Sequence, residues 1–74
     1  MNQEAERVEA AIARLEAQVQ SRLGRHIGGL LIRREADGLV LRGQTRTYYA
    51  KQIAQHAVME VSDLPILANQ IEVI

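Results

Sequence analysis

The stretch DGLVLRGQT, from Asp37 to Thr45, determines how the rest of the chain is interpreted. Asp-Gly is a strong signal for a tight hairpin turn, and Gly38 can adopt a positive φ without strain. The following residues alternate between the two faces of a strand: Leu39 and Leu41 on one, Val40 and Arg42 on the other. Gly43 ends the alternation. The stretch therefore predicts the second strand of a β-hairpin, from Leu39 to Arg42 or Gly43.

The first strand of this hairpin precedes the turn. Gly28 and Gly29 break any helix, and three aliphatic residues then begin a strand that runs from residue 30 to Ala36. Leu30 and Ile32 are expected to point inward, because Arg33 and Glu35 then point to water.

A long helix is predicted before the hairpin, over residues 4–23. Its apolar residues recur at helical spacing, and Gly24 with Arg22 provides a typical C-terminal end. The stripe consists of Val8, Ile12, Leu15, Val19 and Leu23.

A second helix is predicted after the hairpin, capped by Thr45 or Thr47 and ended by the Ser-Asp-Leu-Pro stretch 62–65. Its inward stripe is Tyr49, Ala50, Ile53, Ala54, Ala57, Val58 and Val61. One of Tyr48 and Tyr49 is expected in the core and the other near the surface. The last nine residues, ILANQIEVI (66–74), alternate as a third strand with Asn69, Ile71 and Val73 on one face.

The order helix, strand, strand, helix, strand predicts one α+β domain over residues 1–74. A hairpin followed by a crossover gives a three-stranded mixed sheet, and two amphipathic helices can cover only one of its faces. The core predicted from these patterns is Val8, Ile12, Leu15, Val19, Leu30, Ile32, Leu39, Leu41, Ile53, Ala57, Val61, Ile71 and Val73.

Composition limits the possible functions. The chain has 74 residues and no cysteine, so disulfides and thiolate metal sites are excluded. The N-terminal residues lack the cationic start and apolar run of a signal peptide. We expect a cytoplasmic protein, or an envelope or periplasmic module if the chain is cut from a longer exported protein.

Charge is unevenly distributed although the net charge is zero. Residues 1–19 sum to −2, residues 20–51 to +5 and residues 52–74 to −3. The basic centre could meet an anionic partner, or it could be an ordinary solvated surface.

No constellation typical of catalysis is present. Two histidines, His26 and His56, are expected to face solvent, and neither has a cysteine or clustered carboxylates with metal-ligand spacing. No GXXG loop of the kind that clamps RNA occurs, and the two adjacent tyrosines give no stacking platform. We therefore expect no enzyme activity, no cofactor, no metal and no nucleic-acid partner.

The chain resembles the BON domain, a bacterial module named for osmotically inducible and nodulation proteins. The matching features are DGLVLRG (37–43), the helix TYYAKQIAQHAV (47–58) and the closing strand ANQIEVI (68–74). Many BON domains have a glycine-valine turn where this chain has VSDLPI (61–66). The resemblance implies a non-catalytic interaction module, and several members of the family look like binders of phospholipid or membrane surfaces.

Two kinds of partner follow from these observations. The first is an anionic phospholipid surface, contacted by bases and an amphipathic ring; its predicted residues are Arg22, Arg25, Arg42, Arg46, Tyr48 and Lys51, with His26 beside them. The second is another protein, or a second copy in a homo-oligomer, packed on the open face of the sheet. The aliphatic residues predicted for this contact are Leu31, Val40 and Ile74.

Overall fold

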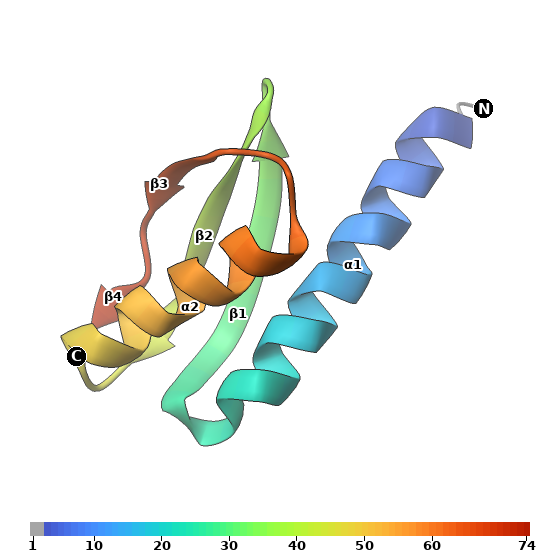
Figure 1. The fold of residues 1–74 in the computed structure, drawn as a ribbon. Helices are drawn as coiled ribbons and strands as arrows, with labels where there is room; N and C mark the ends of the chain where they lie inside the picture. Colours follow the sequence, from blue (N-terminus) through green and yellow to red (C-terminus); the bar gives the residue numbers. More distant parts are fainter. Residues whose placement is uncertain (1–2) are drawn as a thin grey trace.

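The computed structural model describes residues 3–74 of the chain (Figure 1). Two helices and a mixed sheet form an α+β domain, as the sequence predicts. The elements in chain order are α1 (Gln3–Leu23), the short 3-10 helix η1 (Gly24–His26), β1 (Ile27–Glu35), β2 (Gly38–Thr45), α2 (Tyr48–Val61), β3 (Ile66–Asn69) and β4 (Glu72–Val73).

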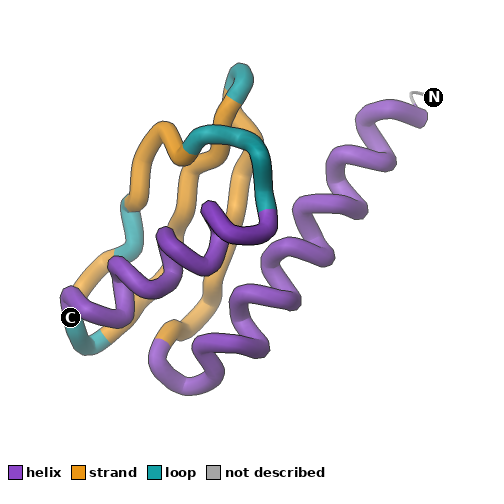
Figure 2. Tube along the Cα trace, in the orientation of Figure 1, coloured by secondary structure: helices purple, strands orange, loops and turns teal. Residues whose placement is uncertain are grey.

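The sheet is built around β2. It pairs with β1 in antiparallel fashion and with both β3 and β4 in parallel fashion. The predicted third strand is therefore present, but it is split into two short pieces (Figure 2). The split falls at Gln70 and Ile71, where the Asn69 side chain accepts a hydrogen bond from the Ile71 N–H at 3.2 Å.

The core lies between the sheet and the two helices. Leu41 and Val58 are fully buried at its centre. The inward positions predicted for Leu39 and Leu41 are confirmed and Arg42 is exposed, but Val40 between them is also buried. Buried apolar residues come from every layer: Leu15, Val19, Leu23, Ile27, Leu30, Ile32, Leu39, Leu41, Ala54, Ala57, Val58 and Ile71.

Part of the predicted core is wrong. Val61 is 47% exposed because it is the last residue of α2, and Val73 is 44% exposed in the short terminal strand. Val8 is only half-buried, whereas Ile12 and Ile53 are half-buried and pack against the core. Tyr49, predicted in the inward stripe of α2, is 75% exposed in the first turn of the helix.

Three boundaries of the hairpin also differ from prediction. β1 begins at Ile27, and Gly28 and Gly29 lie inside it at a bulge in the register. β2 continues past Gly43 to Thr45, because Thr45 pairs with Ile27 on one side and with β4 on the other. The turn residue with positive φ is Ala36, at 51°, and not Gly38.

Helix α1 also protects the outer edge of the sheet. The Glu16 carboxylate accepts a hydrogen bond from the Ile32 N–H at 2.8 Å, and the Gln20 amide bridges β1 by accepting from the Leu30 N–H and donating to the Ile27 carbonyl. Backbone groups of an edge strand that would otherwise lie unpaired are thus satisfied by side chains. The first half of α1 runs beyond this contact, since its buried residues begin only at Leu15 (Figure 1).

Replacing Glu16 with alanine is expected to lower the free energy of unfolding by about 1.5–3 kcal/mol. The reason is that the variant loses a charge-assisted hydrogen bond and leaves a partly buried N–H without its partner. Urea denaturation followed by circular dichroism measures the change. Ala17→Ser, at an exposed position of the same helix, is the control and should stay within about 0.5 kcal/mol. Equal stability of Glu16→Ala and the parent chain would contradict the proposed edge contact.

Candidate anion-binding end of the domain

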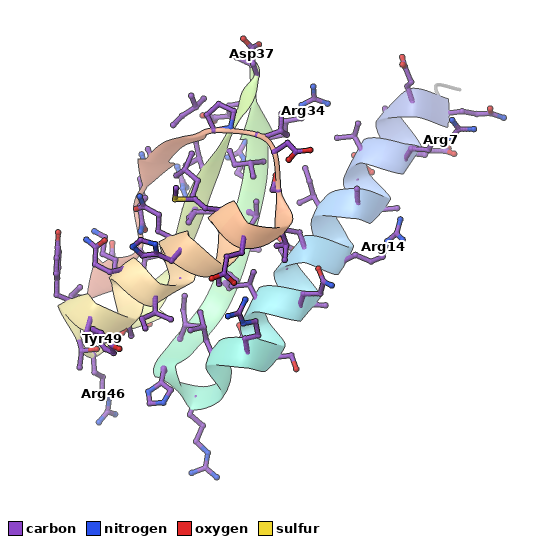
Figure 3. All side chains as sticks on the ribbon, viewed as in Figure 1. Arg7, Arg14, Arg34, Asp37, Arg46 and Tyr49 are labelled. Atoms are coloured by element: carbon purple, nitrogen blue, oxygen red, sulfur yellow. The ribbon has the colours of Figure 1, made fainter. Side chains whose placement is uncertain are left out.

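One end of the molecule gathers basic side chains from segments far apart in the sequence. Arg25 and His26 of η1, Arg46 of the β2–α2 loop and the C-terminal Ile74 line one shallow depression of about 160 Å³. Its remaining lining residues are Gly28, Gln44 and Thr45, so no acidic side chain takes part. We call this region, together with Tyr48 and Tyr49 beside it, the basic end. Figure 3 shows Arg46 and Tyr49 at this end, close to the start of α2.

Local hydrogen bonds fix the loop that presents Arg46. The buried Thr45 hydroxyl accepts from the Thr47 N–H and donates to the Thr47 carbonyl, both at 3.1 Å. The Thr47 hydroxyl in turn accepts from the Ala50 N–H at 3.0 Å, which makes Thr47 the N-cap of α2. Each threonine thus satisfies backbone donors at the start of the helix, and Arg46 between them is held on the outside.

Both tyrosines are exposed at this end, by 64% for Tyr48 and 75% for Tyr49. The prediction that one of them packs in the core is wrong. The buried stripe of α2 begins one residue later, at Ala50, and the helix starts at the end of the molecule (Figure 1). The basic end therefore presents two amphipathic rings beside its cations.

Arg22 lies outside this group. Its guanidinium forms an ion pair with Glu60 of α2 at 2.7 Å, which links the ends of the two helices. The Arg22 guanidinium, by hydrogen bond and by charge, lowers the pKa of the Glu60 carboxyl below its ordinary value. Because the folded-state pKa is depressed, the contact stabilises the fold above the ordinary carboxyl pKa and is lost as pH falls through the depressed value.

Arg42 lines a different depression, which adjoins the one at the basic end and shares Gly28 and Gln44 with it. It lies on the open face of the sheet, where its Nε donates to the Gln70 side-chain oxygen at 3.1 Å. The depression that it lines contains Glu72 together with glycines of the β1 bulge. Lys51 is half-buried in the first turn of α2, and its carbonyl accepts a hydrogen bond from Asn69 at 3.1 Å. Of the six predicted residues, the structure thus gathers Arg25, Arg46 and Tyr48, with Lys51 one turn away.

Tyr49 was missed by the sequence reasoning because helical periodicity assigned it to the apolar stripe. Its position directly after the cap and Tyr48 was the available signal, since a first helical turn is often uncovered. Ile74 was predicted for a different contact, and the structure places it beside Arg25 and Arg46.

The alternative surface on the open sheet face is less apolar than predicted. Leu31 and Ile74 are exposed by 55% and 70%, but Val40 is only 5% exposed. Val40 lies on the central strand, where its register neighbours Arg33 and Ala68 flank it on both sides. The prediction that Val40 is an exposed contact residue is therefore wrong.

Both histidines, His26 and His56, are exposed, as predicted. Residues 3–74 contain no group of three or more histidine and carboxylate side chains placed to share a metal ion. Within the same residues, neither helix combines the length and the apolar character needed to cross a membrane.

Comparisons of the chain with protein-family models, with curated proteins and with solved structures found no match. The resemblance to BON domains therefore stays a prediction, and the fold defines the chain only as a small α+β domain.

Proposed function

We propose that the chain is a non-catalytic interaction module that docks onto anionic phospholipid surfaces through its basic end. The observation that carries this proposal is the meeting of Arg25, His26 and Arg46 at a depression lined by no acidic side chain, next to two exposed tyrosines. Bases attract an anionic surface, and tyrosine rings lie favourably at the level of lipid headgroups.

The side chains of the basic end support a shallow contact with the lipid headgroups and not insertion into the bilayer. Ile74 adds one exposed aliphatic side chain beside the arginines, while the rest of the basic end is polar or aromatic. A contact of this kind depends on charge, with roughly 1 kcal/mol for each base near the surface, and it weakens as salt screens the charges.

Arg25→Glu combined with Arg46→Glu is expected to weaken binding to anionic vesicles by about 30-fold or more. Loss of two bases removes roughly 2 kcal/mol, and the new acids add repulsion. Flotation with vesicles of phosphatidylglycerol and phosphatidylcholine, against phosphatidylcholine alone, measures the effect at low and high salt. Wild-type chain should float only with the anionic vesicles and only at low salt.

Arg42→Glu is the matched control, because Arg42 has the same chemistry but lies on the sheet face in contact with Gln70. It should retain most of the binding. Equal loss in Arg42→Glu and the double variant would contradict the assignment to the basic end. Absence of wild-type binding to every vesicle would overturn the lipid proposal itself and favour a protein partner.

A further inference from the structure

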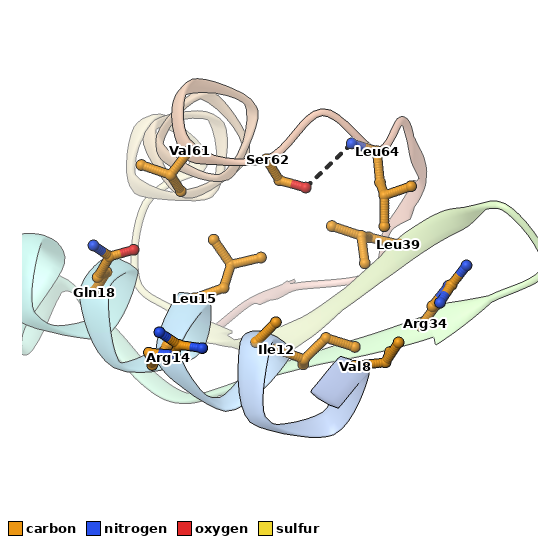
Figure 4. A pocket seen from close by; sticks show the side chains of 11 residues that line it. Val8, Ile12, Arg14, Leu15, Gln18, Arg34, Leu39, Val61, Ser62 and Leu64 are labelled. Carbon is orange, nitrogen blue, oxygen red and sulfur yellow. Dashed lines mark hydrogen bonds between the residues drawn. The ribbon is translucent and has the colours of Figure 1, made fainter. Parts of the chain in front are cut away.

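A second candidate site lies far from the basic end, between the first half of α1 and the segment that leaves α2. It is a groove of about 440 Å³ (Figure 4). One wall is formed by Val8, Ala11 and Ile12 of α1, and the other by Val61 and Leu64. Ser62 shapes the second wall, since its hydroxyl accepts the Leu64 N–H at 3.2 Å and turns the chain there.

The floor and most of the walls of the groove are apolar. Leu39, only 1% exposed, and Leu15, 8% exposed, form its floor, whereas Val8, Ile12 and Leu64 are half-buried on its walls. Val61 at the rim is 47% exposed. The apolar surface is thus arranged as a slot that reaches the core and stays open to solvent, and its volume lies within the range of small-molecule sites.

The charged side chains that line the groove are all positive. Its two charged lining residues, Arg14 and Arg34, lie at opposite ends in Figure 4, and no acid lines it. The two ends are not equivalent, because Arg34 also lines a neighbouring depression together with Glu4 and Glu9. Arg14 instead lies beside Gln18, one helical turn away on α1. The Arg14 end is therefore the better position for an anion.

We propose that this groove binds a fatty acid, with its acyl chain in the apolar slot and its carboxylate at Arg14 and Gln18. A guanidinium and an amide supply donors to the two carboxylate oxygens, and the slot removes the chain from water. This proposal does not depend on the proposed function, since none of its residues belongs to the basic end.

The direct test uses laurate below its micelle concentration and the ¹⁵N-labelled chain. Amide signals of residues that line the groove should shift, while those of the basic end should not. Affinity should rise about fourfold for each methylene added between octanoate and laurate, because each methylene buried contributes in proportion to its area. Dodecyltrimethylammonium, which has the same chain and the opposite charge, should bind at least about tenfold more weakly.

Two substitutions test whether laurate binds in this groove. Arg14→Glu and Val61→Asp should each weaken laurate binding by about tenfold or more, since one reverses the charge at the head and the other adds an acid at the rim. Both positions are exposed, so folding should be retained, as circular dichroism can check. Arg7→Glu, an exposed position of α1 outside the groove, is the control and should bind as the wild type does.

Other outcomes would overturn the proposal. These are equal binding of laurate and dodecyltrimethylammonium, unchanged affinity in Arg14→Glu, or tighter binding of lysophosphatidylglycerol than of laurate, which would identify a phospholipid instead. The fatty-acid proposal and the membrane proposal can fail independently. Vesicle binding depends on Arg25 and Arg46, whereas laurate binding depends on Arg14.

Discussion

Replacing Leu41 with alanine is expected to lower the free energy of unfolding by about 3–5 kcal/mol. Leu41 is fully buried on the central strand, where Ile32 is its partner in β1 and Asn69 its partner in β3. Strands hold it on both sides, so the backbone cannot collapse into the space that the variant would open. A domain of 74 residues has a total stability of roughly 4–11 kcal/mol at the average per residue, so much of it would be lost.

Leu31→Ala is the matched control for Leu41→Ala. Leu31 is the same residue type in the same hairpin, but it lies on the open face and is 55% exposed. Its truncation should change stability by no more than about 0.5–1 kcal/mol. Urea denaturation of both variants under one set of conditions provides the comparison. A loss below about 1 kcal/mol for Leu41→Ala would mean that the two faces of the strand are reversed.

Much of the fold could be predicted because its signals are local. The inward positions of Leu39 and Leu41, the part of the α1 stripe from Leu15 to Leu23 and the Thr47 cap each depend on neighbours in sequence, and each is present in the structure. The interruptions of the strands, namely the bulge in β1 and the break between β3 and β4, were harder to predict. The bulge at Gly28 depends on pairing with β2, and the break after Asn69 depends on a side chain that also donates to Lys51 and Gln55 of α2.

The candidate site was less predictable, for a related physical reason. Periodicity tells which face of an element a residue occupies, but not whether another element covers that face. Tyr49 shares a helical stripe with buried residues and is exposed, whereas Val40 is on the open face and is covered by its strand neighbours. Arg42 and Arg46 are four residues apart, yet Arg42 lies within β2 and Arg46 in the loop after it, and they line different depressions.

Gly38→Ala is expected to lower the free energy of unfolding by about 1–3 kcal/mol, because Pro65 and Leu67 lie close against Gly38 at the start of β2. A Cβ at residue 38 would lie 2.8 Å from the Pro65 carbonyl oxygen and would overlap the Leu67 side chain. Leu67 is 54% exposed and can move, but the Pro65 carbonyl accepts the Leu39 N–H at 2.9 Å and is held in place. Glycine is thus required here by close approach of another chain segment, not by the positive φ that an Asp-Gly turn suggests.

Gly28→Ala provides a control with the opposite expected sign. Gly28 also lies in a strand, but a Cβ there has only the Gln44 carbonyl oxygen nearby, at 3.9 Å, and its φ is not positive. Alanine should therefore raise the free energy of unfolding by about 0.4–1 kcal/mol, because it restricts the unfolded chain without strain in the folded one. Thermal and urea denaturation of the two variants would show the difference. Equal effects of both substitutions would contradict the close contact between Gly38 and the segment that contains Pro65 and Leu67.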